Sequence, residues 1–152
     1  TAVINTEAQA WAKQYTYDLV KGITDTTRTN LQNAISKFTQ SGGMTMGEVQ
    51  SMLEPAFGKG RASVISITEV SRAYSQGAKI QQDMLASDGI KMQRVWHSNA
   101  DSLVDIICRS LNGKTENENG MFVSDYNGRA YFAPPDPHPG CRCGLGLKIK
   151  RA

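Results

Sequence analysis

The chain has 152 residues, of which 39% are hydrophobic and 20% charged, so it can form one domain, or one domain with a helical extension. Its net charge of +3 is too small to indicate a nucleic-acid-binding protein, because such domains usually cluster Lys and Arg on one face. No run approaches the ~20 apolar residues of a membrane span, and no signal peptide is visible. Because the chain begins at Thr1 rather than Met, we expect a fragment or a trimmed product.

Four helices are predicted in the first half of the chain. Apolar residues recur there at the 3.6-residue spacing of a helix with one buried face. We expect these helices at residues 6–22, 24–40, 45–58 and 61–87. The third begins with a capping box, since Glu48 follows Thr45 by three residues. Glycines favour turns over helix continuation, and those expected to end the helices are Gly22, Gly42 with Gly43, Gly58 with Gly60, and Gly89.

The fourth predicted helix is the longest and is expected to lie at the centre of a bundle. Its apolar residues cover a strip wide enough to contact more than one neighbour. The expected inner seam is Val64, Ile67, Val70, Tyr74, Ala78, Gln81 and Leu85. The apolar positions of the first helix are Ala10, Trp11, Tyr15, Leu19 and Val20.

The pattern changes after residue 89. Residues 90–97 alternate in the manner of a strand, with Arg94 and Trp96 on the same side. A short helix at 101–111 and a polar loop at 114–120 are expected to follow.

A hairpin is predicted at residues 121–133, because the central Asn127-Gly128 pair tolerates the positive φ angles of a type I′ turn. The prolines at 134, 135, 137 and 139 predict a stiff, extended segment, and a last strand is expected at 145–149. The elements together predict an α+β fold. It has an N-terminal helical hairpin or bundle with one long central helix, followed by a small antiparallel β unit with a Cys/His cluster.

The three cysteines, Cys108, Cys141 and Cys143, lie in the last third of the chain. An odd number without a secretion signal argues against a disulfide scaffold. Zinc takes four ligands, usually Cys and His, in tetrahedral geometry. The cysteines could supply three of them, and the fourth could be His138, His97 or Asp105. Inert buried thiols and a disulfide are the alternatives, because the Cys-x-Cys spacing alone is not a strong zinc signature.

The sequence predicts no catalytic constellation. A nucleophilic Cys141 would need a base and an orienting group, and His138 is close to it only in sequence. Glu69 is a lone carboxylate in the long helix, where Arg72 or Arg61 can share its face. We therefore expect a binding protein and not an enzyme.

Several short motifs follow one another in a specific order. They are Arg61, residues 66–70 with Thr68 and Glu69, residues 72–74 starting with Arg72, Gly77, residues 95–97 around Trp96, the Asp101 region, residues 108–114, Pro134-Pro135 and residues 138–143. In order and approximate spacing they resemble the Mu F-like phage head morphogenesis, or minor capsid, proteins, and they are similar to the SPP1 minor head protein. The motif-bearing part covers residues 61–149, and the N-terminal helices match only in character.

The resemblance implies a low-copy internal head protein, found in the virion head or in the cytoplasm of the host bacterium. It would bind the portal and other capsid proteins, would aid DNA packaging or delivery, and would have no membrane partner. It also divides the chain into an N-terminal helical arm, 1–58, and a Mu F-like head morphogenesis domain, 59–152. The family commonly has Cys-x-x-Cys where this chain has Asp105 three residues before Cys108, so one thiolate is lost or replaced by a carboxylate.

Two other interpretations follow from the same residues. The family's domain also occurs joined to toxin domains, so a nuclease or transferase is the second interpretation, and it would need polar groups that converge in a pocket. Its candidate residues would be Glu69, His97 and His138. The third is a weak DNA contact through the basic cluster Lys148, Lys150 and Arg151, which is otherwise a solvated tail.

Overall fold

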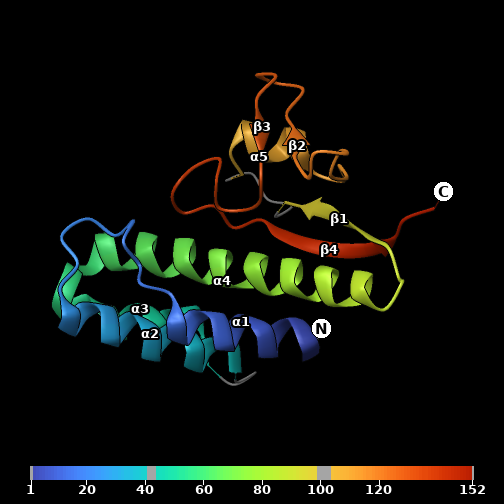
Figure 1. The fold of residues 1–152 in the computed structure, drawn as a ribbon. Helices are drawn as coiled ribbons and strands as arrows, with labels where there is room; N and C mark the ends of the chain where they lie inside the picture. The colour runs from blue at the N-terminus through green and yellow to red at the C-terminus, as the bar shows by residue number, and fades with distance from the viewer. Residues whose placement is uncertain (1, 41–43, 99–103, 152) are drawn as a thin grey trace.

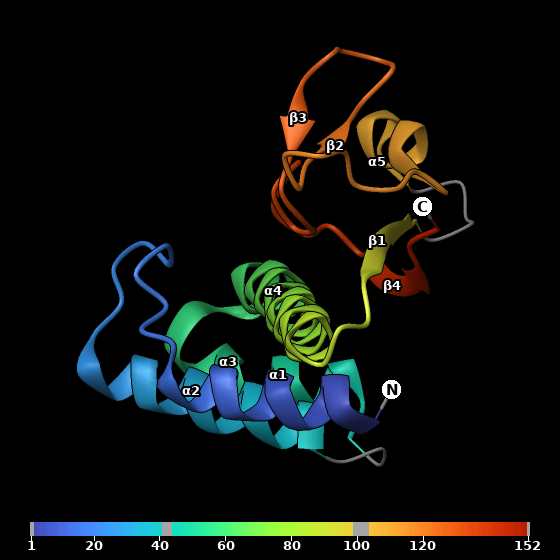
Figure 2. The same cartoon turned by 45° about the vertical axis from the view of Figure 1, so that its right-hand side comes forward.

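The computed structural model describes residues 2–40, 44–98 and 104–151. The helices are α1 (Ala2–Gln14), α2 (Asp25–Gln40), α3 (Met46–Phe57), α4 (Lys59–Ser87) and α5 (Ile106–Leu111). The strands are β1 (Met92–His97), β2 (Phe122–Val123), β3 (Ala130–Tyr131) and β4 (Gly144–Ile149). Figures 1 and 2 show α1, α2 and α3 along one side of the long α4, with the strands and α5 on the other side. The predicted α+β fold is confirmed.

The helices α1 to α4 share one apolar core. Its fully buried side chains include Leu31 and Ile35 of α2 and Val49 and Leu53 of α3. The buried face of α4 is made largely of small residues, among them Ala62, Ser66, Ala73 and Gly77. Small side chains at a contact allow two helices to approach closely, which explains why the seam predicted for α4 is only partly correct. Its member Val64 is exposed, whereas Val70 is buried.

The start of α2 and the ends of α3 and α4 follow the predicted signals closely. The side chain of Thr45 accepts a hydrogen bond of 3.2 Å from the backbone N–H of Glu48, as the capping box predicts. Gly58 has a φ of 79° and separates α3 from α4. The expected break at Gly60 is wrong, because the turn at Gly58 alone redirects the chain and Gly60 is already helical. The stop expected at Gly42 and Gly43 lies outside the described residues.

The first helix ends earlier than the glycine at 22 predicted. It ends at Gln14, and Tyr17 then adopts a φ of 54°. This turn places the Tyr17 ring fully in the core, where its hydroxyl donates a 3.0 Å hydrogen bond to the Ala12 carbonyl. Leu19, which a continuous helix would turn inward, is 69% exposed. A buried aromatic ring with a satisfied hydroxyl thus replaces two further turns of helix.

Among the described residues, the β unit contains two antiparallel strand pairs. β1 pairs with β4, so that Trp96 lies opposite Leu145, and β2 pairs with β3. The predicted alternation in β1 is confirmed, since Arg94 and Trp96 are both fully buried. A further bridge joins Val95 to Thr115, which holds the polar loop beside β1.

Two local predictions in the β unit are wrong. The hairpin does not have a two-residue type I′ turn, because only Gly128 has a positive φ there and the backbone N–H of Gly128 bonds to the Ser124 carbonyl. The segment 133–140 is a series of turns and bends and not an extended rod. The Asp136 carboxylate accepts hydrogen bonds from the backbone of Phe132 and Ala133, which bends the proline-rich segment back on itself.

None of the described helices is both long and apolar enough to cross a bilayer. α4 packs against α1, α2 and α3 on one side and also contacts β1 and β4. The long helix is therefore the element that positions the β unit relative to the helical layer.

Candidate metal centre

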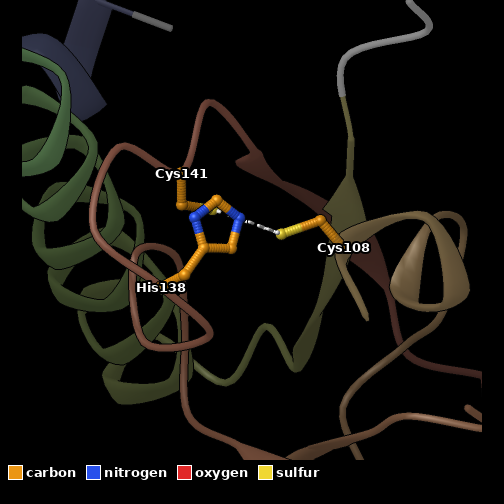
Figure 3. Close-up of side chains that lie close together, drawn as sticks. All are labelled: Cys108, His138 and Cys141. Atoms are coloured by element: carbon orange, nitrogen blue, oxygen red, sulfur yellow. Dashed lines mark hydrogen bonds between the residues drawn. The ribbon is translucent and has the colours of Figure 1, made fainter. Parts of the chain in front are cut away.

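Cys108, His138 and Cys141 lie close together in the β unit. Cys108 Sγ is 3.2 Å from His138 Nε2 and 3.6 Å from Cys141 Sγ. Their potential ligand atoms all lie within 4.8 Å of one another. Figure 3 shows the His138 ring pointing toward Cys108, with Cys141 coming from the same loop as His138. Two sulfurs and one imidazole nitrogen thus come together, although His138 and Cys141 lie 30 and 33 positions after Cys108 in the chain.

Local structure explains how the two segments meet. Cys108 lies in the first turn of α5, whose N-terminus is capped by the Asp105 side chain. Gly140 has a φ of 78° and donates its backbone N–H to Thr68 Oγ1 of α4 at 2.7 Å. The turn between His138 and Cys141 is therefore anchored on the long helix. A residue with a Cβ atom would be strained at this φ.

The imidazole of His138 is oriented for ligation. Its Nδ1 lies 2.8 Å from the carbonyl oxygen of Pro139, an arrangement in which Nδ1 carries the proton and donates it. In a neutral imidazole with this tautomer, the lone pair of Nε2 faces Cys108. Metal-bound histidines usually hold their second nitrogen in this way.

Cys143 lies next to this cluster, because it lines the same small cavity as Cys108 and His138. A small cavity of about 30 Å³ is lined by Cys108, His138 and Cys143, and also by Asp105 and Arg142. The backbone carbonyl of Cys143 accepts a 3.2 Å hydrogen bond from Ser71 of α4. Both ends of the segment 140–143 are thus attached to α4.

The three thiols are buried, and the hydrogen bonds between them shift their pKa values in different directions. Hydrogen bonds from Cys108 and Cys141 hold the pKa of Cys143 at about 3. Donation to Cys141 and Cys143, together with burial, raises the pKa of Cys108 far above its ordinary value. The bond from Cys108 lowers the pKa of Cys141, but its bond to Cys143 and its burial outweigh this and raise the pKa to about 12. A cation at the centre would take the place of the shared protons and favour the thiolate at each sulfur.

The alternative ligands lie differently. Asp105 is exposed, and its Oδ1 accepts a 2.8 Å hydrogen bond from the backbone N–H of Ile107, so its carboxylate already caps α5. His97 is exposed at the end of β1, and its ring lies against Gly146 of β4. Neither joins the described cluster. The Asp101 region lies outside the described residues.

The motif residues of α4 have structural partners. Glu69 is buried and its carboxylate receives the Arg72 Nε–H at 3.1 Å, so the expected ion pair forms. Burial raises the pKa of Glu69, although the charge of Arg72 opposes the change. Arg61 does not reach Glu69. Its guanidinium donates to the Lys21 carbonyl and lies 5.3 Å from the centre of the Phe57 ring.

Sequence reasoning missed the ion pair between Arg94 and Glu116. The Arg94 side chain is fully buried and that of Glu116 is 11% exposed. Burial alone would raise the pKa of Glu116, but the Arg94 N–H groups, the Gln82 amide and the Arg94 charge lower it overall. An arginine on the inward side of a strand is the signal that could have revealed the pair, since a buried charge needs a partner.

A larger hollow of about 960 Å³ lies between α4 and β4. Its lining includes Ile67, Val70 and Tyr74 of α4 and Leu145 and Leu147 of β4. The described residues that line it include no Asp, Glu or His. The candidates Glu69, His97 and His138 of the enzymatic interpretation are not brought together in it.

The family predicted from the motifs is confirmed by comparison with known proteins. A family model described as Phage Mu protein F like protein matches residues 6–146. The match includes the N-terminal helices, whose similarity the motifs did not reveal. No curated protein and no solved structure matches the chain.

Proposed function

The chain belongs to the phage Mu protein F like family, and we propose that it is a minor head protein that acts without catalysis in phage head morphogenesis. The family match over residues 6–146 is the observation that carries this proposal. Its partners would be the portal and other proteins of the procapsid. Its place would be the virion head, after assembly in the host bacterium.

The helical layer is the surface proposed to contact the portal. It exposes several large apolar side chains, among them Leu19, Met52 and Val64. Exposed apolar residues are individually common, but they are also what a protein partner buries. The β unit, attached to the opposite side of α4, would then remain available to a second partner in the procapsid.

Zinc is the ion proposed for the Cys/His cluster. Two or three thiolates and one imidazole are the ligands that Zn²⁺ prefers, whereas Mg²⁺ and Ca²⁺ prefer oxygen. The residues fit such an ion, since Cys108, Cys141 and His138 Nε2 already converge. The ion would neutralise buried thiolates and join α5 to the segment 138–143. That segment is itself bonded to α4 through Thr68 and Ser71.

A weak DNA contact is a secondary proposal for the end of β4. Lys148, Lys150 and Arg151 are all exposed there, and a basic cluster attracts phosphate groups. Affinity for duplex DNA that falls steeply with salt would support this contact. Binding that is absent even at low salt would reject it.

The assembly proposal is tested by mixing the purified protein with the portal oligomer of the phage that encodes it. Co-sedimentation in a fixed ratio is expected. If neither the portal nor empty procapsids retain the protein, the proposal fails. Elemental analysis of the same preparation tests zinc separately, with about one ion per chain as the expected result.

A further inference from the structure

The indole of Trp96 is buried in the β unit, in the same cluster as the three cysteines. The side chain is fully buried on β1, and its Nε1 has no hydrogen-bond partner among the described residues. Buried N–H groups almost always have an acceptor. A donor without an acceptor, buried in a cluster of cysteines, therefore points to a thiolate sulfur that becomes its acceptor when a metal ion is bound.

The register of the sheet brings this donor to Cys143. Trp96 lies directly opposite Leu145, and side chains two residues apart along an extended chain point to the same side. Diagonal neighbours across a pair of strands are within reach of a large aromatic ring. Trp96 accordingly belongs to the same buried cluster as Cys108, Cys141 and Cys143.

The net charge of the metal-filled site explains why a hydrogen bond from the Trp96 indole to Cys143 would be favourable. Three thiolates and one neutral imidazole around Zn²⁺ carry a net charge of −1. Burying that charge is costly unless N–H groups bond to the sulfurs. The Trp96 indole is such a donor, and Cys143, in the same buried cluster, lines the cavity of about 30 Å³ together with Cys108 and His138.

We propose that Cys143 is the fourth ligand of the metal and that Trp96 is a positioning residue which donates its indole N–H to the Cys143 thiolate. The inference rests on the zinc site proposed above. Asp105 remains the cap of α5 and His97 remains beside Gly146. With four protein ligands the site has no open position, which is the arrangement of structural and not of catalytic zinc.

Cobalt substitution tests both parts. The wild-type protein is expected to bind one Co²⁺ and to show the charge-transfer absorption of three thiolates. Cys143→Ser should reduce that absorption by about one third, since one of three sulfur ligands is lost. Trp96→Phe should retain its intensity, shift its energy and weaken the affinity for the metal by about 10- to 100-fold, as loss of an outer partner usually does. Trp11→Phe, in the helical layer, is the matched control and should change neither.

The outcomes separate this inference from the zinc proposal. A wild-type protein that binds no Co²⁺ or Zn²⁺ rejects the zinc site itself. A wild-type protein that binds metal, with an unchanged spectrum in Cys143→Ser or unchanged affinity and spectrum in Trp96→Phe, rejects only the present inference.

If the variants do not fold, NMR spectroscopy of the ¹⁵N-labelled wild-type protein tests the proposed hydrogen bond directly. Its Trp96 indole proton should shift downfield when metal is added, whereas the Trp11 proton should not. A Trp96 proton that does not move on metal loading contradicts the proposed hydrogen bond.

Discussion

Arg94 Nε lies 3.0 Å from Glu116 Oε2, and the arginine of this pair is fully buried. The same guanidinium donates hydrogen bonds to the carbonyls of Gly120 and Phe132. It also lies over the rings of Phe122 and Phe132. One side chain on β1 thus joins the polar loop, β2 and the segment after β3. This pair and the cysteine cluster each join segments of the β unit that lie far apart in the sequence.

Removing the charge of Glu116 should destabilise the β unit. Glu116→Gln leaves the Arg94 charge buried without its counterion, and we expect a loss of about 3 kcal/mol in the free energy of unfolding. Glu118→Gln, an exposed carboxylate in the same loop, is the matched control and should change stability by less than about 0.5 kcal/mol. Denaturant titration of both variants measures the difference, and equal losses would show that the pair contributes nothing specific.

The same pair predicts a dependence on pH. Because the folded protein lowers the pKa of Glu116 below its ordinary value of 4.5, the stabilisation is complete above that value and is lost as the pH falls through the folded pKa. The stability difference between the wild-type protein and Glu116→Gln should therefore be constant near neutral pH and shrink below pH 4.5. A difference that stays constant well into acid would mean that the carboxylate is not responsible.

Metal should stabilise the protein through His138. Excess zinc, at about 1,000 times its dissociation constant, should add about 4 kcal/mol to the free energy of unfolding, and a chelator should remove this gain. His138→Ala should abolish the response to the chelator. His97→Ala, which changes the other histidine, should keep it. A melting temperature that chelation leaves unchanged in the wild-type protein would exclude a structural metal.

Portal binding should depend on the helical layer and not on the hairpin. Met52→Asp places a charge on an exposed apolar position of α3 and should reduce retention by the portal without lowering the melting temperature. Val123→Asp makes the same change at an exposed position of β2, with 40% exposure against 42% for Met52. If the hairpin variant loses binding and the α3 variant keeps it, the contact surface has been assigned to the wrong half of the molecule.

The regular elements could be predicted from the sequence because they depend on local patterns. The boundary between α3 and α4 and the end of α4 follow from caps and glycines, and β1 follows from an alternation that buries Trp96 and Arg94. The early end of α1 could not be predicted in this way. A positive φ at Tyr17 is unfavourable locally, and the core that surrounds its ring is what stabilises it.

The candidate site could be predicted only in part, for a similar reason. Its residue types and the turn at Gly140 are visible in the sequence, which made Cys108, His138 and the Cys141 segment candidates. Which fourth group could join them depends on tertiary contacts, such as the use of Asp105 as a cap and the burial of Cys143 in the same cluster as Trp96. The ion pair of Arg94 with Glu116 is likewise set by folding across 22 residues.

Quantitative mass spectrometry of procapsids, purified from the phage that encodes the chain, can decide whether the chain is a head protein. We expect the chain in every preparation, at a low and constant number of copies relative to the portal. Procapsids that assemble normally and contain none of the chain would contradict this expectation.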